Sequence, residues 1–331
     1  MNIHKAIVTG GAGFIGKNLV DSLLKEGAQV TVVDNLNSGH LENIIEWFDR
    51  QRFTFIEANC VNFNFLKIID DVDVIFHLAA NPDVRTGLIN TRVDLDNNIL
   101  ATFNLLENIR KSKWRGSLVF TSTSTVYGEP EQIPTPETYG PLKPISLYGA
   151  SKLACESLIS AYCNTFEFSS IIYRFANAVG KNSTHGVIYD LFSKLQTDNK
   201  RLEILGDGTQ VKSYIYIDDC IDGILFGLNK MEENVRILNV GSEDQITVER
   251  IAGIVAEEMQ CNPKLIFTNG IDGGRGWKGD VKNMLLDVSK LKSMGWRCKF
   301  NSSEAVRMAV RDLSNAQKYL IGNSTNDYVN L

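Results

Sequence analysis

A glycine-rich turn between an apolar run and a helical pattern is the feature that most constrains how this chain can fold. Gly10, Gly13 and Gly16 follow the apolar run Ala6–Val8 and open the helical pattern Phe14–Lys25. The first glycine permits a sharp turn, the second lets main-chain N–H groups approach a pyrophosphate, and the third lets the helix pack closely against a sheet. The N-terminus of that helix adds partial positive charge where phosphates would lie. The pattern therefore predicts a dinucleotide site at the first strand-to-helix turn.

An acidic residue at the end of the second apolar run indicates which dinucleotide binds. Asp34 follows Val30–Val33 and lies twenty-four residues after Gly10. Its carboxylate can accept hydrogen bonds from adenosine ribose hydroxyls, whereas it would repel a 2′-phosphate. The segment Asn35–Gly39 holds no arginine that could compensate. The sequence therefore predicts NAD as the cofactor, in preference to NADP.

Strand-like and helix-like segments alternate from residue 5 to about residue 175. Several strands are continuous apolar or β-branched runs, as expected of parallel strands buried on both faces. The alternation predicts an α/β fold with a Rossmann-type, doubly wound parallel sheet. Further helices are predicted over Asn97–Lys111 and Tyr148–Phe166. The predicted strands are Lys5–Val8, Gln29–Val33, Phe53–Glu57, Val74–Leu78, Ser117–Thr121 and Ser169–Tyr173.

Beyond Arg174 the pattern is less regular and predicts a smaller α+β lobe over the carboxyl edge of the sheet. We expect residues 1–175 to form the NAD-binding domain and 176–331 mainly the substrate lobe, with more than one crossing between them. A polar, frayed tail is expected from about residue 321. The predicted elements of this lobe are strands Leu202–Leu205, Ser213–Ile217, Arg236–Val240 and Lys264–Phe267, and helices Asp219–Leu228, Val248–Met259 and Ser303–Leu320.

The composition excludes several functional classes. A net charge of −5 gives no general attraction to nucleic acid or to an anionic membrane. No apolar run approaches the ~20 residues of a membrane span, and the first strand begins too early to leave room for a signal peptide. The six cysteines and four histidines are scattered, with no Cys-x-x-Cys pair. We therefore expect a cytoplasmic protein without a metal, a nucleic-acid partner or a membrane anchor.

A tyrosine and a lysine begin the helix predicted after the fifth strand. Tyr148 and Lys152 are four residues apart, so they lie on one helical face. The lysine ammonium and an oxidised nicotinamide would both lower the phenol pKa from its usual ~10. Such a tyrosine can take a proton from a substrate hydroxyl while hydride leaves the carbon. The hydroxyl-rich segment Thr121–Thr125 ends the fifth strand, at the sheet edge where ligands bind, and offers a second hydroxyl.

Together with further motifs, these features form a family resemblance. His77-Leu78-Ala79-Ala80, Asn97-Asn98, Thr123–Gly128 and Arg174–Asn177 accompany the glycine turn, Asp34-Asn35-Leu36 and the Tyr148/Lys152 pair. From residue 5 to about 315 the chain resembles the extended short-chain dehydrogenase/reductase family, specifically its nucleotide-sugar epimerases and dehydratases. Within these it is most similar to the UDP-glucose 4-epimerase group.

The resemblance implies the catalytic and cofactor residues. Tyr148 is expected to be the acid/base, Lys152 to lower its pKa and bind the nicotinamide ribose, and Thr123 to supply the second hydroxyl. Asn59 stands where relatives usually have an aspartate that contacts adenine. The implied cofactor-binding residues are Gly10, Gly13, Phe14, Ile15, Gly16, Asp34, Asn35, Asn37, Ser38, Gly39, Asn59, Cys60, Leu78, Ala79, Ala80, Asn98, Tyr148 and Lys152.

The resemblance also implies a substrate site and an assembly. Asn177 and Arg275 are expected at the diphosphate, Lys212 where an arginine is common, and Asp280 near the nucleotide ribose, with Thr123 at the sugar. Met284 falls where epimerases have a gate residue beside the hexose. The helices over 97–111 and 148–166 are expected to pair with those of a second copy in a homodimer.

The reaction favoured by these residues is reversible, NAD-dependent 4-epimerisation of an NDP-hexose through a 4-keto intermediate, with UDP-glucose/UDP-galactose or their N-acetyl forms as substrates. Ser124 and Thr125 stand where 4,6-dehydratases carry Asp-Glu, and no extra cationic cluster near Thr123 is evident for a decarboxylase. A simple 4-dehydrogenase is a further alternative. A non-catalytic nucleotide sensor is a different class, but relatives of that kind generally lose the tyrosine or lysine that Tyr148 and Lys152 provide here.

Overall fold

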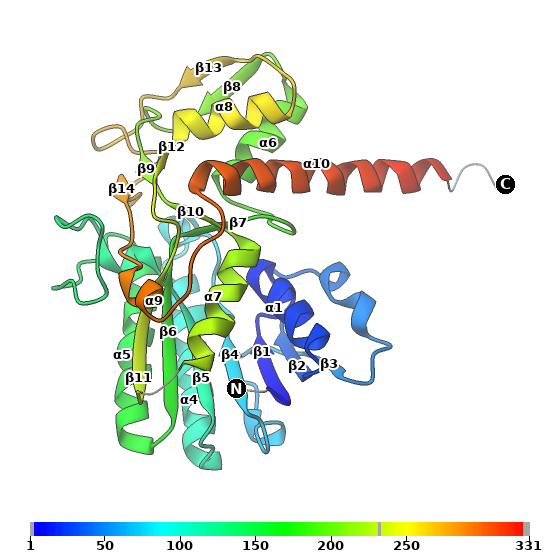
Figure 1. Cartoon of the computed structure of the whole chain (residues 1–331), viewed down its shortest axis with the longest axis vertical. Helices are drawn as coiled ribbons and strands as arrows, with labels where there is room; N and C mark the ends of the chain where they lie inside the picture. Colours follow the sequence, from blue (N-terminus) through cyan, green and yellow to red (C-terminus); the bar gives the residue numbers. More distant parts are fainter. Residues whose placement is uncertain (1–2, 231–232, 327–331) are drawn as a thin grey trace.

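A seven-stranded parallel sheet forms the centre of the computed structural model, which describes residues 3–230 and 233–326 (Figure 1). The strand order is β11-β6-β5-β4-β1-β2-β3. Because the order reverses between β1 and β4, the carboxyl ends of these two strands form the switch point where ligands bind in such sheets. This confirms the predicted doubly wound sheet. The strands are β1 (Lys5–Thr9), β2 (Gln29–Asp34), β3 (Phe53–Glu57), β4 (Val74–His77), β5 (Ser117–Thr123), β6 (Ser169–Phe175) and β11 (Val235–Val240).

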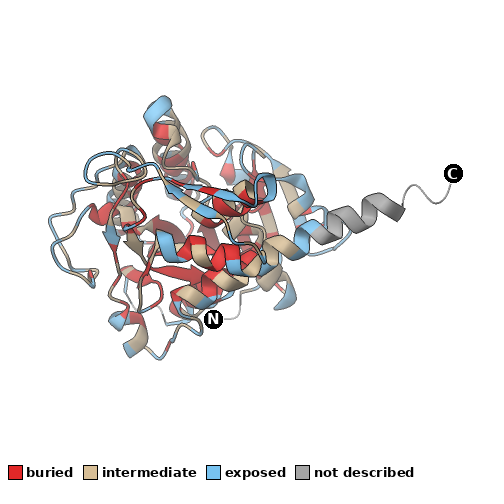
Figure 2. Ribbon diagram, turned by 90° about the horizontal axis from the view of Figure 1, so that it is seen from above, coloured by how far each residue is buried: buried red, intermediate tan, exposed pale blue. Residues whose placement is uncertain are grey.

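Helices cover both faces of this sheet and create two separate cores. Successive residues of a strand point to opposite faces, so Val8 packs with α1 (Phe14–Lys25) and α7 (Ile217–Asn229), whereas Ile7 packs with the helices of the other face. Those are α4 (Ala101–Ser112), preceded by a π-helical turn over Leu95–Leu100, and α5 (Leu147–Phe166). Figure 2 shows that the buried residues gather on the strands and on the inner sides of the helices.

The second lobe lies over the carboxyl ends of the strands, at the top of Figure 1. It contains α6 (Val187–Thr197), α8 (Val248–Glu258) and α10 (Ser302–Asn326), and the sequence did not predict α6. Its short strands pair as β7 with β10, β8 with β13, and β12-β9-β14. These strands are β7 (Asn177–Val179), β8 (Arg201–Ile204), β9 (Val211–Lys212), β10 (Tyr214–Tyr216), β12 (Ile246–Thr247), β13 (Lys264–Phe267) and β14 (Asn283–Met284). The remaining short helices are α2 (Thr86–Ile89), α3 (Arg92–Asp94), α9 (Ser289–Ser293) and 3₁₀ turns over Leu41–Asn43, Ile45–Trp47, Phe65–Lys67 and Ser124–Tyr127.

The structure differs from the prediction in the place of one strand and in the end of one helix. The strand expected at Arg236–Val240 in the second lobe is β11, and it pairs in parallel with β6 at the edge of the central sheet. A parallel strand needs a long crossover, and here the crossover includes part of the second lobe and α7. At the carboxyl end, α10 continues to Asn326, past the expected end at Leu320. Of the tail expected from about 321, residues 327–331 lie outside the described residues.

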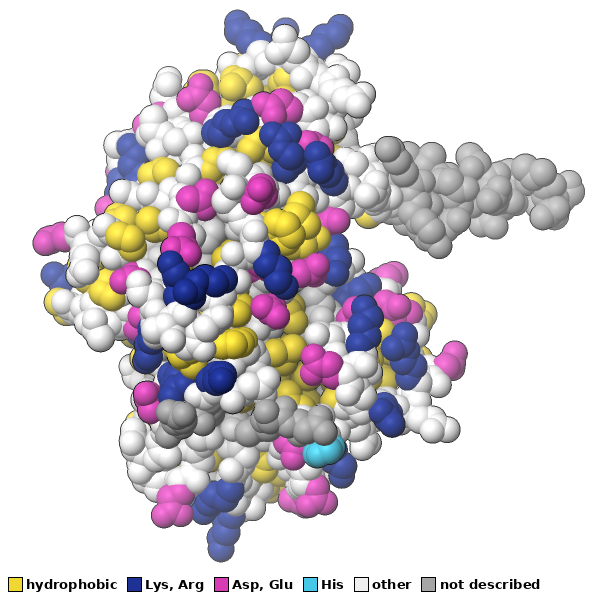
Figure 3. All heavy atoms as spheres, in the orientation of Figure 1, with side chains coloured by type: hydrophobic (Ala, Val, Ile, Leu, Met, Phe, Trp, Pro, Cys, Tyr) yellow, Lys and Arg dark blue, Asp and Glu magenta, His cyan; other side chains and the backbone are white. Residues whose placement is uncertain are grey.

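The described residues show mixed surface charge and free thiols. On the face drawn in Figure 3, Lys and Arg side chains are interspersed with Asp and Glu. All six cysteines are free thiols. Within residues 3–230 and 233–326, no group of three or more His, Cys, Asp and Glu side chains is placed to hold a metal ion. No helix in the same part of the chain is long and apolar enough to span a membrane.

Candidate active site

A cavity of about 460 Å³ lies at the carboxyl ends of the central strands and is lined by both lobes. Three of the predicted residues are not in its lining, namely Gly39, Asn98 and Arg275. The cavity, called the cleft below, brings together most of the predicted site. The predicted residues that line it are Gly10, Gly13, Phe14, Ile15, Gly16, Asp34, Asn35, Asn37, Ser38, Asn59, Cys60, Leu78, Ala79, Ala80, Thr123, Tyr148, Lys152, Asn177, Lys212, Asp280 and Met284.

The glycine turn has the geometry that a dinucleotide requires. Gly10 adopts a φ of +71°, and a Cβ there would lie 2.7 Å from the main-chain nitrogen of Ala79. A Cβ on Gly16 would lie 2.1 Å from the carbonyl oxygen of Gly10, so α1 can approach the turn only with glycine there. No side chain caps the N-terminus of α1 at Gly13. The N–H groups of that helix end therefore remain available for a pyrophosphate, and these residues fit a bound NAD.

Asp34 is placed to receive the adenosine ribose. It is only 7% exposed, and burial raises the pKa of its carboxyl group. One carboxylate oxygen accepts a hydrogen bond from the amide of Ala12 at 2.9 Å, and the other accepts from the amide of Leu36 at 2.9 Å. Since each oxygen carries a second lone pair, both can still accept from hydroxyl groups. Gly39 packs against the backbone of Ala12. A Cβ added at Gly39 would lie 2.8 Å from the carbonyl carbon of Ala12, so only glycine allows this close contact.

The catalytic residues predicted from two separate motifs meet in the cleft. Ser146 caps α5 by accepting a hydrogen bond from the amide of Gly149 at 3.1 Å, and this starts the helix one residue before Tyr148. The Lys152 ammonium donates to the carbonyl of Thr121 at 2.9 Å and lies 6.0 Å from the centre of the Tyr148 ring. Thr123 ends β5 and accepts from the amide of the residue two positions later at 3.2 Å.

The pKa of Tyr148 differs from the prediction, because it lies above the usual value of a phenol and not below it. Burial raises the pKa of Tyr148, and the charge of Asp94 adds to this effect. Burial also lowers the pKa of Lys152 to about 8. In the chain alone the Tyr148 pKa is therefore above its usual value, and the predicted lowering by Lys152 is not observed. Any net lowering must come from a cationic group bound beside them.

A buried ion pair that was not predicted from the sequence joins α5 to β6. Glu156 and Arg174 are 4% and 3% exposed, and their closest atoms, Oε2 and Nη2, are 2.7 Å apart. Ser122, next to the catalytic threonine, donates to Glu156 Oε1. Arg174 also donates to the Tyr127 hydroxyl at 3.0 Å, and that hydroxyl donates to Asn239 of β11 at 2.8 Å. The sequence signal that could have found Glu156 is its spacing of four residues from Lys152, which continues the helical face of Tyr148 and Lys152 by one more turn.

A neutral histidine, His77 of β4, links the end of β1 to helix α4. His77 is fully buried, and burial lowers its pKa to about 3, with the Lys152 charge adding to the effect. Its Nδ1 lies 2.7 Å from the Thr9 hydroxyl and its Nε2 lies 3.0 Å from the Thr102 hydroxyl. Asn98 lies behind the cleft wall, where its Oδ1 accepts from the amide of Asn81 at 2.9 Å. In the described structure Asn98 therefore holds the segment around Asn81 in place. Its direct contact with the cofactor stays a prediction.

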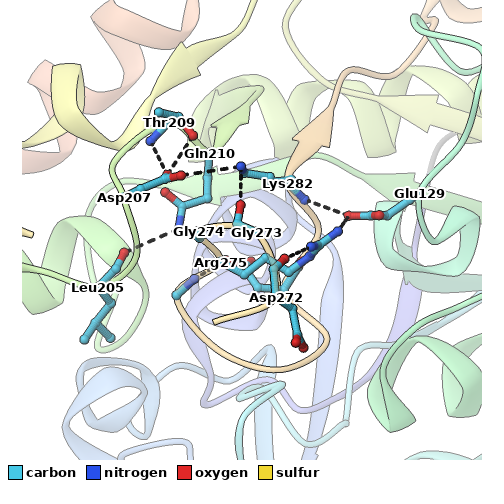
Figure 4. A network of polar contacts seen from close by, with 12 residues as sticks. Glu129, Leu205, Asp207, Thr209, Gln210, Asp272, Gly273, Gly274, Arg275 and Lys282 are labelled. Carbon is cyan, nitrogen blue, oxygen red and sulfur yellow. Dashed lines mark hydrogen bonds and ion pairs between the residues drawn. The ribbon is translucent and has the colours of Figure 1, made fainter. Parts of the chain in front are cut away.

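The substrate residues of the second lobe are only partly brought together. Asn177 donates to the carbonyl of Ser213 at 3.1 Å in the cleft wall. Lys212 lies 2.5 Å from an oxygen of Asp280, so its charge is already matched by a carboxylate. Arg275 is not among the residues that line the cleft. Figure 4 shows its guanidinium next to the carboxylate of Glu129 and the main-chain carbonyl of Asp272.

The cleft lining also includes side chains that were not found from the sequence. Arg85, Trp277 and His185 all line the cavity. The Arg85 guanidinium lies 5.9 Å from the centre of the Trp277 ring, and the Lys212 ammonium lies 5.6 Å from the centre of the same ring. Burial lowers the pKa of His185, whereas Asp83 and Asp190 act in the opposite direction. These side chains come from irregular segments, where spacing carries no signal.

Comparison with known proteins agrees with this geometry. A model of the NAD dependent epimerase/dehydratase family matches residues 6–241. The chain is 31% identical over 315 residues to a putative UDP-glucose 4-epimerase of Methanocaldococcus jannaschii, which covers 93% of this chain and 98% of that protein. A crystal structure of UDP-galactose 4-epimerase matches with a TM-score of 0.83 at 39% identity, covering 94% of this chain and 99% of that chain.

A second solved structure extends the comparison to another sugar. UDP-glucuronic acid 4-epimerase from Bacillus cereus, in complex with UDP-glucuronic acid and NAD, matches with a TM-score of 0.84 at 28% identity, covering 94% of this chain and 99% of that chain. The family model spans well over half of the sequence, and it includes the glycine turn, Asp34 and the Tyr148/Lys152 pair. The chain belongs to the NAD-dependent epimerase/dehydratase family.

Proposed function

We propose that this chain catalyses the reversible 4-epimerisation of a UDP-hexose, with UDP-glucose and UDP-galactose or their N-acetyl forms as substrates. The observation that carries the proposal is the meeting of Tyr148, Lys152 and Thr123 in one cleft with a glycine turn fit for NAD. Several relatives of the chain across almost its whole length are named UDP-sugar 4-epimerases, and others of similar identity are named UDP-glucuronic acid decarboxylases. Bound NAD would accept hydride from C4 and return it.

The residues of the chain then move one proton and hold the sugar. Tyr148 takes the proton of the C4 hydroxyl as the C–H bond breaks, and returns it to the 4-keto oxygen when the opposite face has been presented. Thr123 hydrogen-bonds the same oxygen from the end of β5. Lys152, fixed by the Thr121 carbonyl, keeps a positive charge near the tyrosinate. Epimerisation needs no further acid or base, only room for the 4-keto sugar to rotate.

The alternative reactions need groups that this cleft does not offer at the reacting end. Dehydration would need an additional acid and base beside Thr123, where Ser124 and Thr125 stand. Decarboxylation requires a uronate, and the sequence offers no extra cationic cluster near Thr123 to hold one. A 4-dehydrogenase would release NADH in each turnover. These remain the competing outcomes of the test below.

Incubation with a panel of UDP-, GDP-, dTDP- and CDP-sugars, followed by NMR of the products, tests the proposal. We expect conversion of a UDP-hexose to its C4 epimer without net release of NADH. Loss of water, release of carbon dioxide or stoichiometric NADH would each contradict it in favour of the corresponding alternative. Failure to convert any sugar while UDP still binds would favour a non-catalytic sensor.

The preference for NAD over NADP can be measured directly. We expect wild-type protein to bind NAD about tenfold or more tightly than NADP, because a 2′-phosphate would meet the Asp34 carboxylate with no cation in Asn35–Gly39. Isothermal titration of both dinucleotides gives the ratio. Asp34→Asn keeps the side-chain shape and removes the charge, so it should reduce the preference for NAD over NADP. Equal or tighter binding of NADP by the wild type contradicts the assignment.

Met284 is expected to admit N-acetyl sugars. It lines the cleft on β14, directly beside Lys212 of β9, and its side chain is flexible. We expect UDP-N-acetylglucosamine to be converted alongside UDP-glucose. Met284→Tyr should lower kcat/KM for the N-acetyl sugar by about 10-fold or more and spare UDP-glucose, whereas Met284→Leu should change neither. Rejection of the N-acetyl sugar by the wild type would remove this argument.

A homodimer through α4 and α5 is the assembly that we propose. Leu95, Phe103 and Leu147 are 42%, 45% and 46% exposed on α4, α5 and the turn before α4, where a second copy could cover them. We expect a dimer by light scattering at micromolar concentration and a monomer for Phe103→Asp. Ile45→Asp changes an equally apolar exposed position elsewhere and should remain dimeric. A monomeric wild type would refute the assembly.

A further inference from the structure

We infer that Arg85 is the arginine that binds the diphosphate of the substrate, in the role that the family resemblance implies for Arg275. This inference rests on the proposed function, because it assumes a nucleoside diphosphate in the cleft. Arg275 is not in the cleft lining, and its Nε donates to the carbonyl of Asp280 at 3.0 Å. A diphosphate in the cleft therefore needs another cation.

Four cationic side chains line the cleft in the part of the chain that the structure describes, namely Arg85, Lys152, Lys194 and Lys212. Lys152 serves the catalytic tyrosine. Lys194 lies in the last turn of α6 and pairs with Glu203 at 3.0 Å. Arg85 and Lys212 are paired as well, with Asp190 and Asp280, but both lie against the same indole, that of Trp277. One ligand lying along that ring can contact both charges.

The N-terminus of α6 faces the same place. Gly186, Val187 and Ile188 line the cleft, and no side chain caps this helix end. Asp190 in the first turn contacts Arg85, so the guanidinium lies beside the N–H groups that the helix leaves without partners. A helix N-terminus and an arginine together form the donor set that phosphate oxygens require.

The present partners of Arg85 leave it free to bind an anion. Asp83 accepts from Nε at 3.0 Å and from Nη2 at 3.0 Å, so it holds one edge of the guanidinium and fixes its direction. Asp190 accepts only from Nη1, at 3.3 Å. The Arg85 and Asp190 side chains are both 38% exposed, and an ion pair so open to water contributes little. A phosphate oxygen can therefore replace Asp190 while Asp83 stays in place.

Titration of the full-length protein with UDP and with uridine tests the role of Arg85. Arg85→Gln should weaken UDP binding by about 10- to 100-fold and leave uridine binding unchanged, since the lost hydrogen bonds go to a charged group. Arg275→Gln, the matched control, should stay within about threefold of wild type for UDP. Asp190→Asn should tighten UDP binding, because it removes the competing carboxylate.

Three results would overturn the inference: unchanged UDP affinity in Arg85→Gln, an equal loss of uridine affinity in that variant, or a larger loss of UDP affinity in Arg275→Gln. Arg85-dependent UDP binding without any epimerised product would instead support the inference and refute the proposed function. A wild type that binds no UDP would refute both.

Discussion

Replacing Tyr148 with phenylalanine is expected to lower kcat for epimerisation by about 10²- to 10⁴-fold, the usual contribution of a positioned acid/base. The ring stays in place, but the atom that accepts and returns the C4 proton is gone. NAD affinity should change little, since the glycine turn, Asp34 and Lys152 remain. Steady-state kinetics with the best substrate of the panel, together with NAD titration, separates the two effects.

Tyr139→Phe provides the matched control for this variant. Tyr139 lies outside the cleft lining, and its hydroxyl accepts from the amide of Glu131 at 3.2 Å. Its kcat should stay within about threefold of the wild type, as expected for a substitution away from the reacting atoms. Near-wild-type turnover by Tyr148→Phe would show that the proton follows another path.

Truncating Glu156 to alanine is expected to reduce the free energy of unfolding by about 3–5 kcal/mol. The reason is that Arg174, only 3% exposed, would keep its charge in a nearly water-free position without a carboxylate. Ser122 would lose its acceptor as well. Urea denaturation followed by circular dichroism measures the shift in midpoint.

The control for this variant is a carboxylate of the same type at the surface. Glu257 pairs with Arg250 at 2.7 Å, but both side chains are about half exposed, so Glu257→Ala should shift the urea midpoint little. If Glu156→Ala shifted the midpoint no more than Glu257→Ala, the buried pair would not stabilise the fold. Glu156→Gln should fall between the two, because an amide keeps hydrogen bonds and loses the charge.

The parts of the molecule that follow from local pattern were predictable. The strands β1 to β6 lie within two residues of their predicted ends because buried parallel strands are continuous apolar runs. The glycine turn and Asp34 were found since each obeys a steric or electrostatic requirement of the backbone around a dinucleotide. Tyr148 and Lys152 were found because helical spacing places them on one face.

Features that depend on side-chain direction or long-range pairing were not predictable. Helix α6 begins after Gly186 with no Ser, Thr, Asp or Asn cap, so the usual signal for a helix start is missing. The sequence around Arg275 cannot tell whether its guanidinium faces the cleft or Glu129. Arg85 lies in a loop whose position depends on the fold of the other lobe. The rise in the Tyr148 pKa comes from burial, which the spacing of two residues does not report.

The position of β11 has a consequence for how the chain is made and how it could be rearranged. During synthesis β6 leaves the ribosome with its outer edge unpaired, and that edge stays open until Val235–Val240 has emerged. A nascent chain must therefore hold an aggregation-prone strand edge while the segment from β7 to α7 is translated. For the same reason, recombination at one point near residue 175 would separate β11 from its neighbour. A swap of substrate lobes between relatives needs two junctions, one on each side of the returning strand.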